Sequence, residues 1–133
     1  MSLFSTLKKL LLATLLFAGV LSIAALFKLG PYMKLMDSPC FTVGVVYNEN
    51  YRGKGRTVLD YYYFSRGNRR YQSTKDVYSL NHYRDRKFLV IYCCLDPEIS
   101  FLVEEREFAD SILVGISLND YEISDFEIPF IEF

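Results

Sequence analysis

The longest apolar run of the chain lies near its amino terminus. Residues 10–27 read LLLATLLFAGVLSIAALF and include no charged side chain. At a rise of 1.5 Å per residue, these residues span roughly 27 Å as a helix, close to the hydrocarbon thickness of about 30 Å of a bilayer. Gly30 and Pro31 follow the run, and Pro31 predicts the end of the helix. We therefore expect a head and transmembrane anchor over residues 1–31, followed by a linker over residues 32–40.

A cleaved signal peptide is the main alternative to a retained anchor. The apolar region of a signal peptide is usually about 7–15 residues long, whereas this run is longer and no small-x-small cleavage motif follows it. Lys8 and Lys9 before the run nearly balance Lys28 and Lys34 after it, so the positive-inside rule is almost neutral. A short head before a long remainder favours an exported, periplasmic domain. We expect a single-pass membrane protein.

Small side chains recur along the predicted helix. Thr14, Ala18 and Ser22 lie four residues apart, with Ala25 beside them. This spacing places them on one face, where a second helix could approach closely. The alternative is that membrane helices are generally rich in small residues.

Beyond residue 40 the chain alternates short β-branched and aromatic runs with Gly, Pro, Asn and Asp, a pattern typical of strands and turns. The expected strands are residues 41–47, 56–65, 69–72, 87–93, 101–103 and 111–118, with a helical turn over residues 104–110. Residues 48–55 and 73–85 are expected to be irregular, and in the second of these segments Tyr78, Leu80 and Tyr83 are the expected anchors onto the sheet. The fold class is therefore an N-terminal transmembrane helix followed by a small mainly-β domain over residues 41–118. That domain is either a twisted antiparallel sheet or a barrel of five or six strands.

Two of these strands have distinctive patterns. In residues 56–65, Leu59, Tyr61 and Tyr63 alternate with polar positions and are expected to face the core. Gly67-Asn68 predicts the tight turn of a hairpin. Residues 87–93 are apolar on both faces, which predicts a central strand buried on both sides.

Charge is distributed unevenly around a net value of −1. Residues 52–87 include ten basic and three acidic side chains, whereas residues 98–132 include ten acidic side chains and one arginine. Such asymmetry indicates either an interaction surface or two halves that neutralise each other in the fold. We favour mutual neutralisation.

Two segments are candidate interaction surfaces. The acidic-aromatic tail, residues 119–133, either lies along its own domain or docks on a partner through Tyr121, Phe126, Phe130 and Phe133. The candidate basic surface comprises Arg52, Lys54, Arg56, Arg69 and Arg70. It suits anionic lipid headgroups. Nucleic acid is a poorer ligand because of the membrane tether and the acidic second half.

The chemistry-bearing residues are few. Cys40, Cys93 and Cys94 do not form an even-numbered disulfide framework, and buried free thiols are the favoured interpretation. Adjacent strand residues point to opposite faces, so at most one of the pair is expected to meet Cys40, and only in an exported domain. His82 with Cys93 or Cys94 is the one conceivable catalytic pair. We expect no catalytic residue, metal or cofactor.

The runs VVY (residues 45–47), DYYYFSRGNRRYQS (residues 60–73) and KFLVIYCCLDPEIS (residues 87–100) follow one another in an order that resembles small bacterial single-pass membrane-anchored β-domain proteins of unknown function. That resemblance implies a small β domain and assigns no active site. The expected function is a non-enzymatic interaction protein with the bilayer and another protein as partners, either an accessory subunit of an envelope complex or an immunity-type inhibitor. The alternatives are a lipid-headgroup or nucleic-acid binding domain and, least favoured, a cysteine-dependent enzyme.

Overall fold

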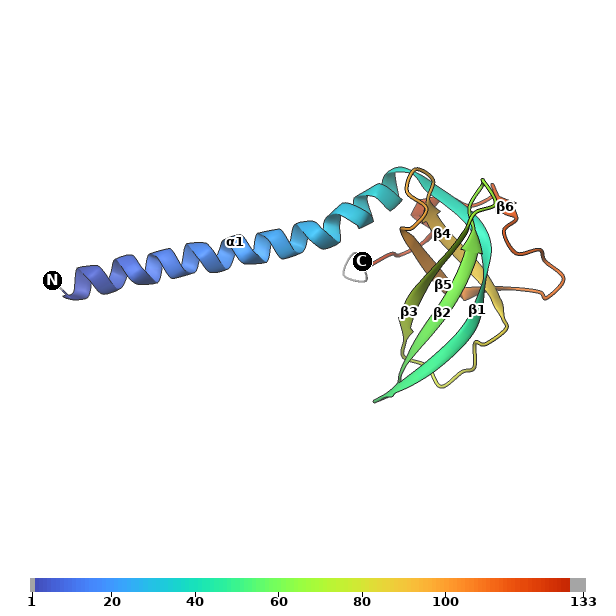
Figure 1. Cartoon of the computed structure of the whole chain (residues 1–133), viewed down its shortest axis with the longest axis horizontal. Coiled ribbons are helices and arrows are strands. Elements are labelled where there is room, and N and C mark those ends of the chain that lie inside the picture. The colour runs from blue at the N-terminus through green and yellow to red at the C-terminus, as the bar shows by residue number, and fades with distance from the viewer. Residues whose placement is uncertain (1, 130–133) are drawn as a thin grey trace. The chain divides into compact units, whose positions relative to one another are not determined.

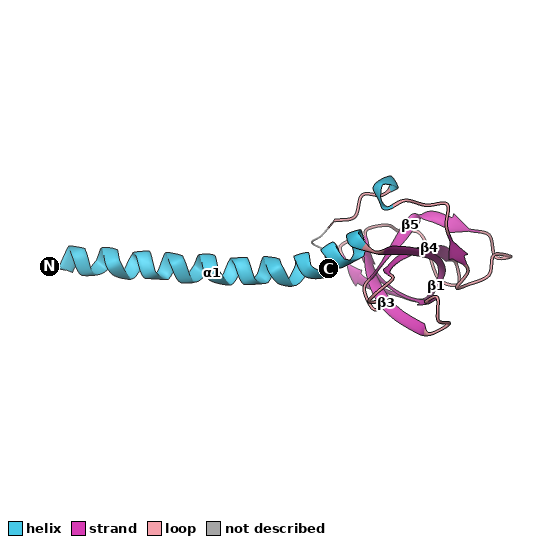
Figure 2. Ribbon diagram, turned by 90° about the horizontal axis from the view of Figure 1, so that it is seen from above, coloured by secondary structure: helices cyan, strands magenta, loops and turns pink. Residues whose placement is uncertain are grey.

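A computed structural model describes residues 2–129, with the side chains of residues 24–26 and 28 left aside. The chain divides after Met33 into a helical unit and a β unit, Lys34–Ile128, and each is considered by itself. The elements are α1 Ser2–Asp37, β1 Pro39–Gly53, β2 Arg56–Phe64, β3 Arg70–Val77, β4 Lys87–Cys93, β5 Ser100–Phe108, β6 Ser117–Leu118 and a short 3₁₀ turn, η1 Ile123–Asp125 (Figures 1 and 2).

The helical unit is predominantly apolar and is exposed over residues 2–23. Its segment Ser2–Ile23 is long and apolar enough to cross a membrane, with a mean hydropathy of 1.7. The expected helix end at Gly30-Pro31 and the expected linker over residues 32–40 are wrong, because α1 continues to Asp37 and β1 begins at Pro39. Pro31 lacks an N–H donor, so it removes one helical hydrogen bond. Leu35, in the turn after Pro31, is completely buried in the β unit, and this burial stabilises the turn as a helix. Ser38 alone separates the helix from β1.

The β unit is one antiparallel sheet with the strand order β3-β2-β1-β4-β5, and β6 also pairs with β1. Long β1 lies at the centre: residues 39–45 pair with β4, and residues 45–53 pair with β2. The hydrogen-bonded path is open, and the sheet curves strongly, as Figure 2 shows. Its edge strands β3 and β5 meet at Lys75, whose ammonium group lies 2.7 Å from the carbonyl oxygen of Leu102. The small mainly-β domain predicted from the sequence is confirmed.

The predicted strands agree with the sheet over residues 41–47, 56–64 and 87–93. The loop expected over residues 48–55 is wrong, because β1 continues to Gly53, and β3 continues to Val77 into the segment expected to be irregular. Of the strand expected over residues 111–118, only Ser117–Leu118 pairs. Residues 87–93 form β4, with Phe88–Cys93 buried. The hairpin turn is confirmed by Asn68, which has a φ of 58° and donates from its backbone N–H to Ser65, 2.9 Å away. The helical turn expected over residues 104–110 is wrong, because β5 runs to Phe108 and pairs there with Lys87.

The interior of the curved sheet is filled by apolar and aromatic side chains. Leu59, Tyr61 and Tyr63 are all at most 1 % exposed, as their alternation predicts. Gly44 marks a close approach: a Cβ atom there would lie 2.5 Å from Cγ2 of Val90 and 2.9 Å from a carbonyl oxygen of β2.

A second apolar layer covers the other face of β1 and β4. Phe41 of β1 contacts Tyr121 and Phe126 of the tail, with ring centroids 5.8 and 6.2 Å apart. Ile128 is also buried. The described part of the tail therefore lies along its own domain, as one of the two sequence alternatives expects.

Candidate functional site

The β unit has two ends with different chemistry. The start of β1, the β2–β3 turn and the β4–β5 turn form the end at which the last turn of α1 enters, here called the proximal end. The β1–β2 hairpin and the β3–β4 loop, residues 78–86, form the opposite, distal end. Figure 1 shows the β1–β2 hairpin at the lower tip of the sheet and the β2–β3 turn at its upper tip.

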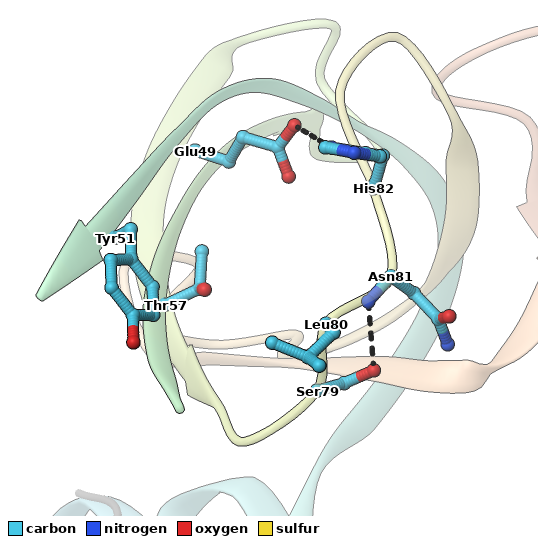
Figure 3. Close-up of a pocket in the computed structure, with 7 residues that line it drawn as sticks. All are labelled: Glu49, Tyr51, Thr57, Ser79, Leu80, Asn81 and His82. Atoms are coloured by element: carbon cyan, nitrogen blue, oxygen red, sulfur yellow. Dashed lines mark hydrogen bonds and ion pairs between the residues drawn. The ribbon is translucent and has the colours of Figure 1, made fainter. Parts of the chain in front are cut away.

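A hollow of about 340 Å³ opens at the distal end between the β1–β2 hairpin and the β3–β4 loop. Its seven lining residues are Glu49, Tyr51, Thr57, Ser79, Leu80, Asn81 and His82. Figure 3 shows the three hairpin residues on one wall and the four loop residues on the other. Because the walls come from separate segments, the hollow exists only when the loop is held against the hairpin.

Glu49 holds the two walls together. Its Oε1 lies 3.3 Å from Nδ1 of His82, and its Oε2 accepts a hydrogen bond of 3.2 Å from the backbone N–H of Tyr83. The Glu49 side chain is only 18 % exposed, whereas that of His82 is 94 % exposed. Tyr83, in the same loop, is buried in the core and so also holds the loop in place. The carboxylate therefore positions the loop, and the histidine ring faces solvent.

The rim of this hollow is apolar and exposed. Tyr51 is 65 % exposed, Leu80 is 86 % exposed, and Tyr78, next to the lining residues in the loop, is 76 % exposed. The sequence predicts Tyr78, Leu80 and Tyr83 as anchors onto the sheet, and this is correct for Tyr83 alone. The distal rim, defined as Tyr51, Tyr78 and Leu80, was missed because a loop side chain's direction is set by the turn and not by a repeating pattern.

The candidate basic surface is divided between the two ends. Arg52, Lys54 and Arg56 lie at the distal hairpin, and Arg56 pairs with Asp76 at 3.0 Å. Arg69 and Arg70 lie at the proximal end. The length of β2, roughly 26 Å at 3.3 Å per residue, separates them from the distal group. The structure therefore does not bring these five residues together as one patch.

The two halves of opposite charge meet in the fold. Lys75 pairs with Glu104 at 2.8 Å, and Arg86 donates from Nε to Oε1 of Glu107 at 2.6 Å. This hydrogen bond raises the pKa of Arg86 and lowers the pKa of Glu107. Both pairs join the basic half to the acidic half, as mutual neutralisation predicts.

The other sequence candidates have local partners. Thr14 and Ser22 donate from their hydroxyls to the carbonyl oxygens of Leu10 and Ala18 in their own helix. Ala18 is exposed, and the side chain of Ala25 lies outside the described residues. Phe130 and Phe133 of the tail also lie outside them.

The expectation of buried free thiols is wrong for two of the three cysteines and correct for the third. Cys40 and Cys94 form a disulfide with a Cα–Cα distance of 5.3 Å, while Cys93 is free and buried. The β1–β4 register sets Cys40 opposite Tyr92, so Cys94 lies on the same face just beyond it. Cys93 points the other way, with Sγ 3.4 Å from the carbonyl oxygen of Lys34.

The conceivable catalytic pair is not assembled. Cys93 ends β4 at the proximal end, whereas His82 precedes β4 at the distal end, so the strand's length of roughly 20 Å separates them. Burial raises the pKa of the proximal Tyr63 and Tyr92 hydroxyls, which keeps them neutral.

Comparison with protein families, curated proteins and solved structures finds no match to this chain.

Proposed function

We propose that this protein is a single-pass membrane protein whose β unit is exported and binds another envelope protein through its distal rim, without catalysing a reaction. The observation that carries the proposal is the exposure of Tyr51 and Leu80, which line one hollow, and of Tyr78 beside them in the β3–β4 loop. Tyrosine is enriched among the residues that dominate binding energy at protein interfaces. A hollow beneath such a rim provides a binding site for a partner side chain.

The disulfide supports export. Disulfides persist in oxidising compartments and are rare in the cytosol. The Cys40–Cys94 bond joins β1 to the end of β4 and so fixes the centre of the sheet. An apolar helix of 22 residues, Ser2–Ile23, supports anchoring. In this account the helix holds the domain at the membrane, and the distal rim reaches the partner.

Site-specific crosslinking tests the proposal. A photoreactive amino acid is placed at Leu80 and, as a matched control, at Leu113, since the two side chains are 86 % and 74 % exposed and belong to different loops. The proposal predicts one discrete adduct from position 80 in intact cells and none from position 113. Tyr51→Ala should weaken that adduct.

Equal crosslinking at both positions, or none at position 80, would remove the distal rim as a binding surface. The identity of the adduct separates the two proposed roles. An accessory subunit crosslinks to a protein of its own complex and its deletion impairs that complex. An immunity-type inhibitor crosslinks to a toxin and its deletion makes the cell sensitive.

A further inference from the structure

Three arginines gather at the β2–β3 turn. Arg66, Arg69 and Arg70 are exposed, and residues 65–70 include no acidic side chain. Among the residues that the structure describes, the ion pairs involve other basic side chains and none of these three. The turn therefore presents a concentrated positive charge at the proximal end.

Aromatic rings hold two of these arginines. The guanidinium of Arg70 lies 4.4 Å from the centroid of Tyr62, and that of Arg69 lies 5.6 Å from the centroid of Tyr71. A cation–π contact engages no carboxylate, so the N–H groups of both guanidinium groups remain for an oxyanion. Phosphate oxygens match this planar set of donors.

An exposed leucine lies in the neighbouring turn. Leu95, between β4 and β5, is 85 % exposed. The two turns are adjacent, because the hydroxyl of Tyr63 at the end of β2 donates to the carbonyl oxygen of Pro97. An apolar side chain beside arginines is the combination that favours the membrane–water interface.

Acidic side chains also lie at this end. Asp96 pairs with Lys34 at 3.8 Å, and Asp37 and Glu98 are exposed. Lys34 offsets Asp96, and Asp125 and Glu127 of the tail lie against Phe101 near the start of β5. The positive charge is therefore confined to the β2–β3 turn, which carries no acidic side chain.

Chain connectivity keeps the proximal end close to the lipid. Lys34, the first residue of the β unit, follows Ile23, the last residue of the apolar segment, by eleven residues of continuous helix. Those residues span roughly 16 Å. A tether of this length gives the proximal turns a high effective concentration at the membrane surface.

We propose that the proximal end of the β unit docks on anionic phospholipid, with Arg66, Arg69 and Arg70 on the phosphates and Leu95 in the interfacial layer. This inference rests on the membrane anchoring in the proposed function and adds a second contact of the domain with the bilayer. Docking restricts the domain's rotation about its tether and holds the distal rim away from the lipid.

Single tryptophans test it cleanly, because the natural chain has none. Leu95→Trp reports docking, Leu80→Trp is the equally exposed distal control, and Phe17→Trp reports insertion of the anchor. The full chain is reconstituted in phosphatidylcholine nanodiscs with or without phosphatidylglycerol, and quenching by brominated acyl chains is measured. We expect strong quenching at position 17 in both lipids, quenching at position 95 that increases with phosphatidylglycerol, and little at position 80.

Charge removal gives the second arm. Each arginine near an anionic surface contributes about fivefold to partitioning, so Arg66→Gln, Arg69→Gln and Arg70→Gln together should return quenching at position 95 to its value in pure phosphatidylcholine. Arg52→Gln with Lys54→Gln at the distal hairpin should leave it unchanged. If position 17 is quenched but position 95 is quenched no more than position 80, the docking is overturned and the anchoring stands. Absence of quenching at position 17 overturns the anchoring itself.

Discussion

Lys75 of β3 donates a hydrogen bond of 2.7 Å to the carbonyl oxygen of Leu102 on β5, across the gap between the two edges of the sheet. The same ammonium group pairs with Glu104 and lies 3.7 Å from the ring centroid of Phe101. Lys75 is only 9 % exposed. A buried cation thus joins edges that have no continuous backbone ladder between them.

Replacing this cation should destabilise the domain. Lys75→Met leaves the carboxylate of Glu104 half-buried without its partner, and we expect a loss of about 2–4 kcal/mol in the free energy of unfolding. Urea unfolding of the full chain in mild detergent measures it. The double variant with Glu104→Leu should recover part of the loss. If Lys75→Met alone is as stable as the natural chain, the contact between the edge strands β3 and β5 does not depend on Lys75.

The disulfide should be a major source of stability. It closes a loop with a sequence separation of 54 residues, for which chain entropy gives about 4 kcal/mol. Cys40→Ser with Cys94→Ser should lower the free energy of unfolding by about that amount, whereas Cys93→Ala, the matched control, should cost roughly 1 kcal/mol. Equal losses in both variants would contradict this account.

Gly44 should not accept a side chain. An alanine methyl group would lie 2.5 Å from Cγ2 of Val90, so Gly44→Ala should cost about 1–3 kcal/mol through overpacking. Gly67→Ala is the control, because nothing lies within 4 Å of its position and its φ is not positive. Thermal unfolding compares the two, and similar melting temperatures would rule out the close approach at Gly44.

Acid should weaken the Arg86–Glu107 pair. Hydrogen bonding to Arg86 lowers the pKa of Glu107 below its ordinary value of 4.5. The pair therefore contributes its stability above that pH and loses it as the pH falls through the lowered pKa of the folded protein. The melting-temperature difference between the natural chain and Arg86→Gln should shrink below about pH 4.5. A constant difference over that range would mean that the pair contributes nothing through ionisation.

Strands β2 and β4 could be predicted from the sequence because their residues follow strict periods, whereas β1 continues to Gly53 through a polar segment that the sequence predicts as a loop. Alternation at Leu59, Tyr61 and Tyr63 and the continuous apolar run of β4 are local signals of burial. The ends of elements depend on distant contacts. The helix continues past Pro31 into the turn in which Leu35 is completely buried. β5 extends past Glu104 because Lys75 and Arg86 neutralise its acidic side chains.

The candidate site could be predicted only in part. Tyr51 and Leu80 carry no sequence signal of their own, since the distal hollow forms where a hairpin and a loop from separate segments meet. The basic residues were correctly recognised as exposed, but their separation along β2 appears only in three dimensions. The pairing of Cys40 with Cys94 and not with Cys93 follows from the β1–β4 register.

An intact-mass measurement tests the central claim, a retained anchor on an exported, disulfide-bonded domain. The protein is taken from native membranes, with thiols trapped by acid and alkylated after denaturation without reductant. The account predicts a mass that includes the apolar helix and one alkyl group, on Cys93. Three alkyl groups would place the domain in a reducing compartment, and a mass lacking the helix would make the segment a cleaved signal peptide.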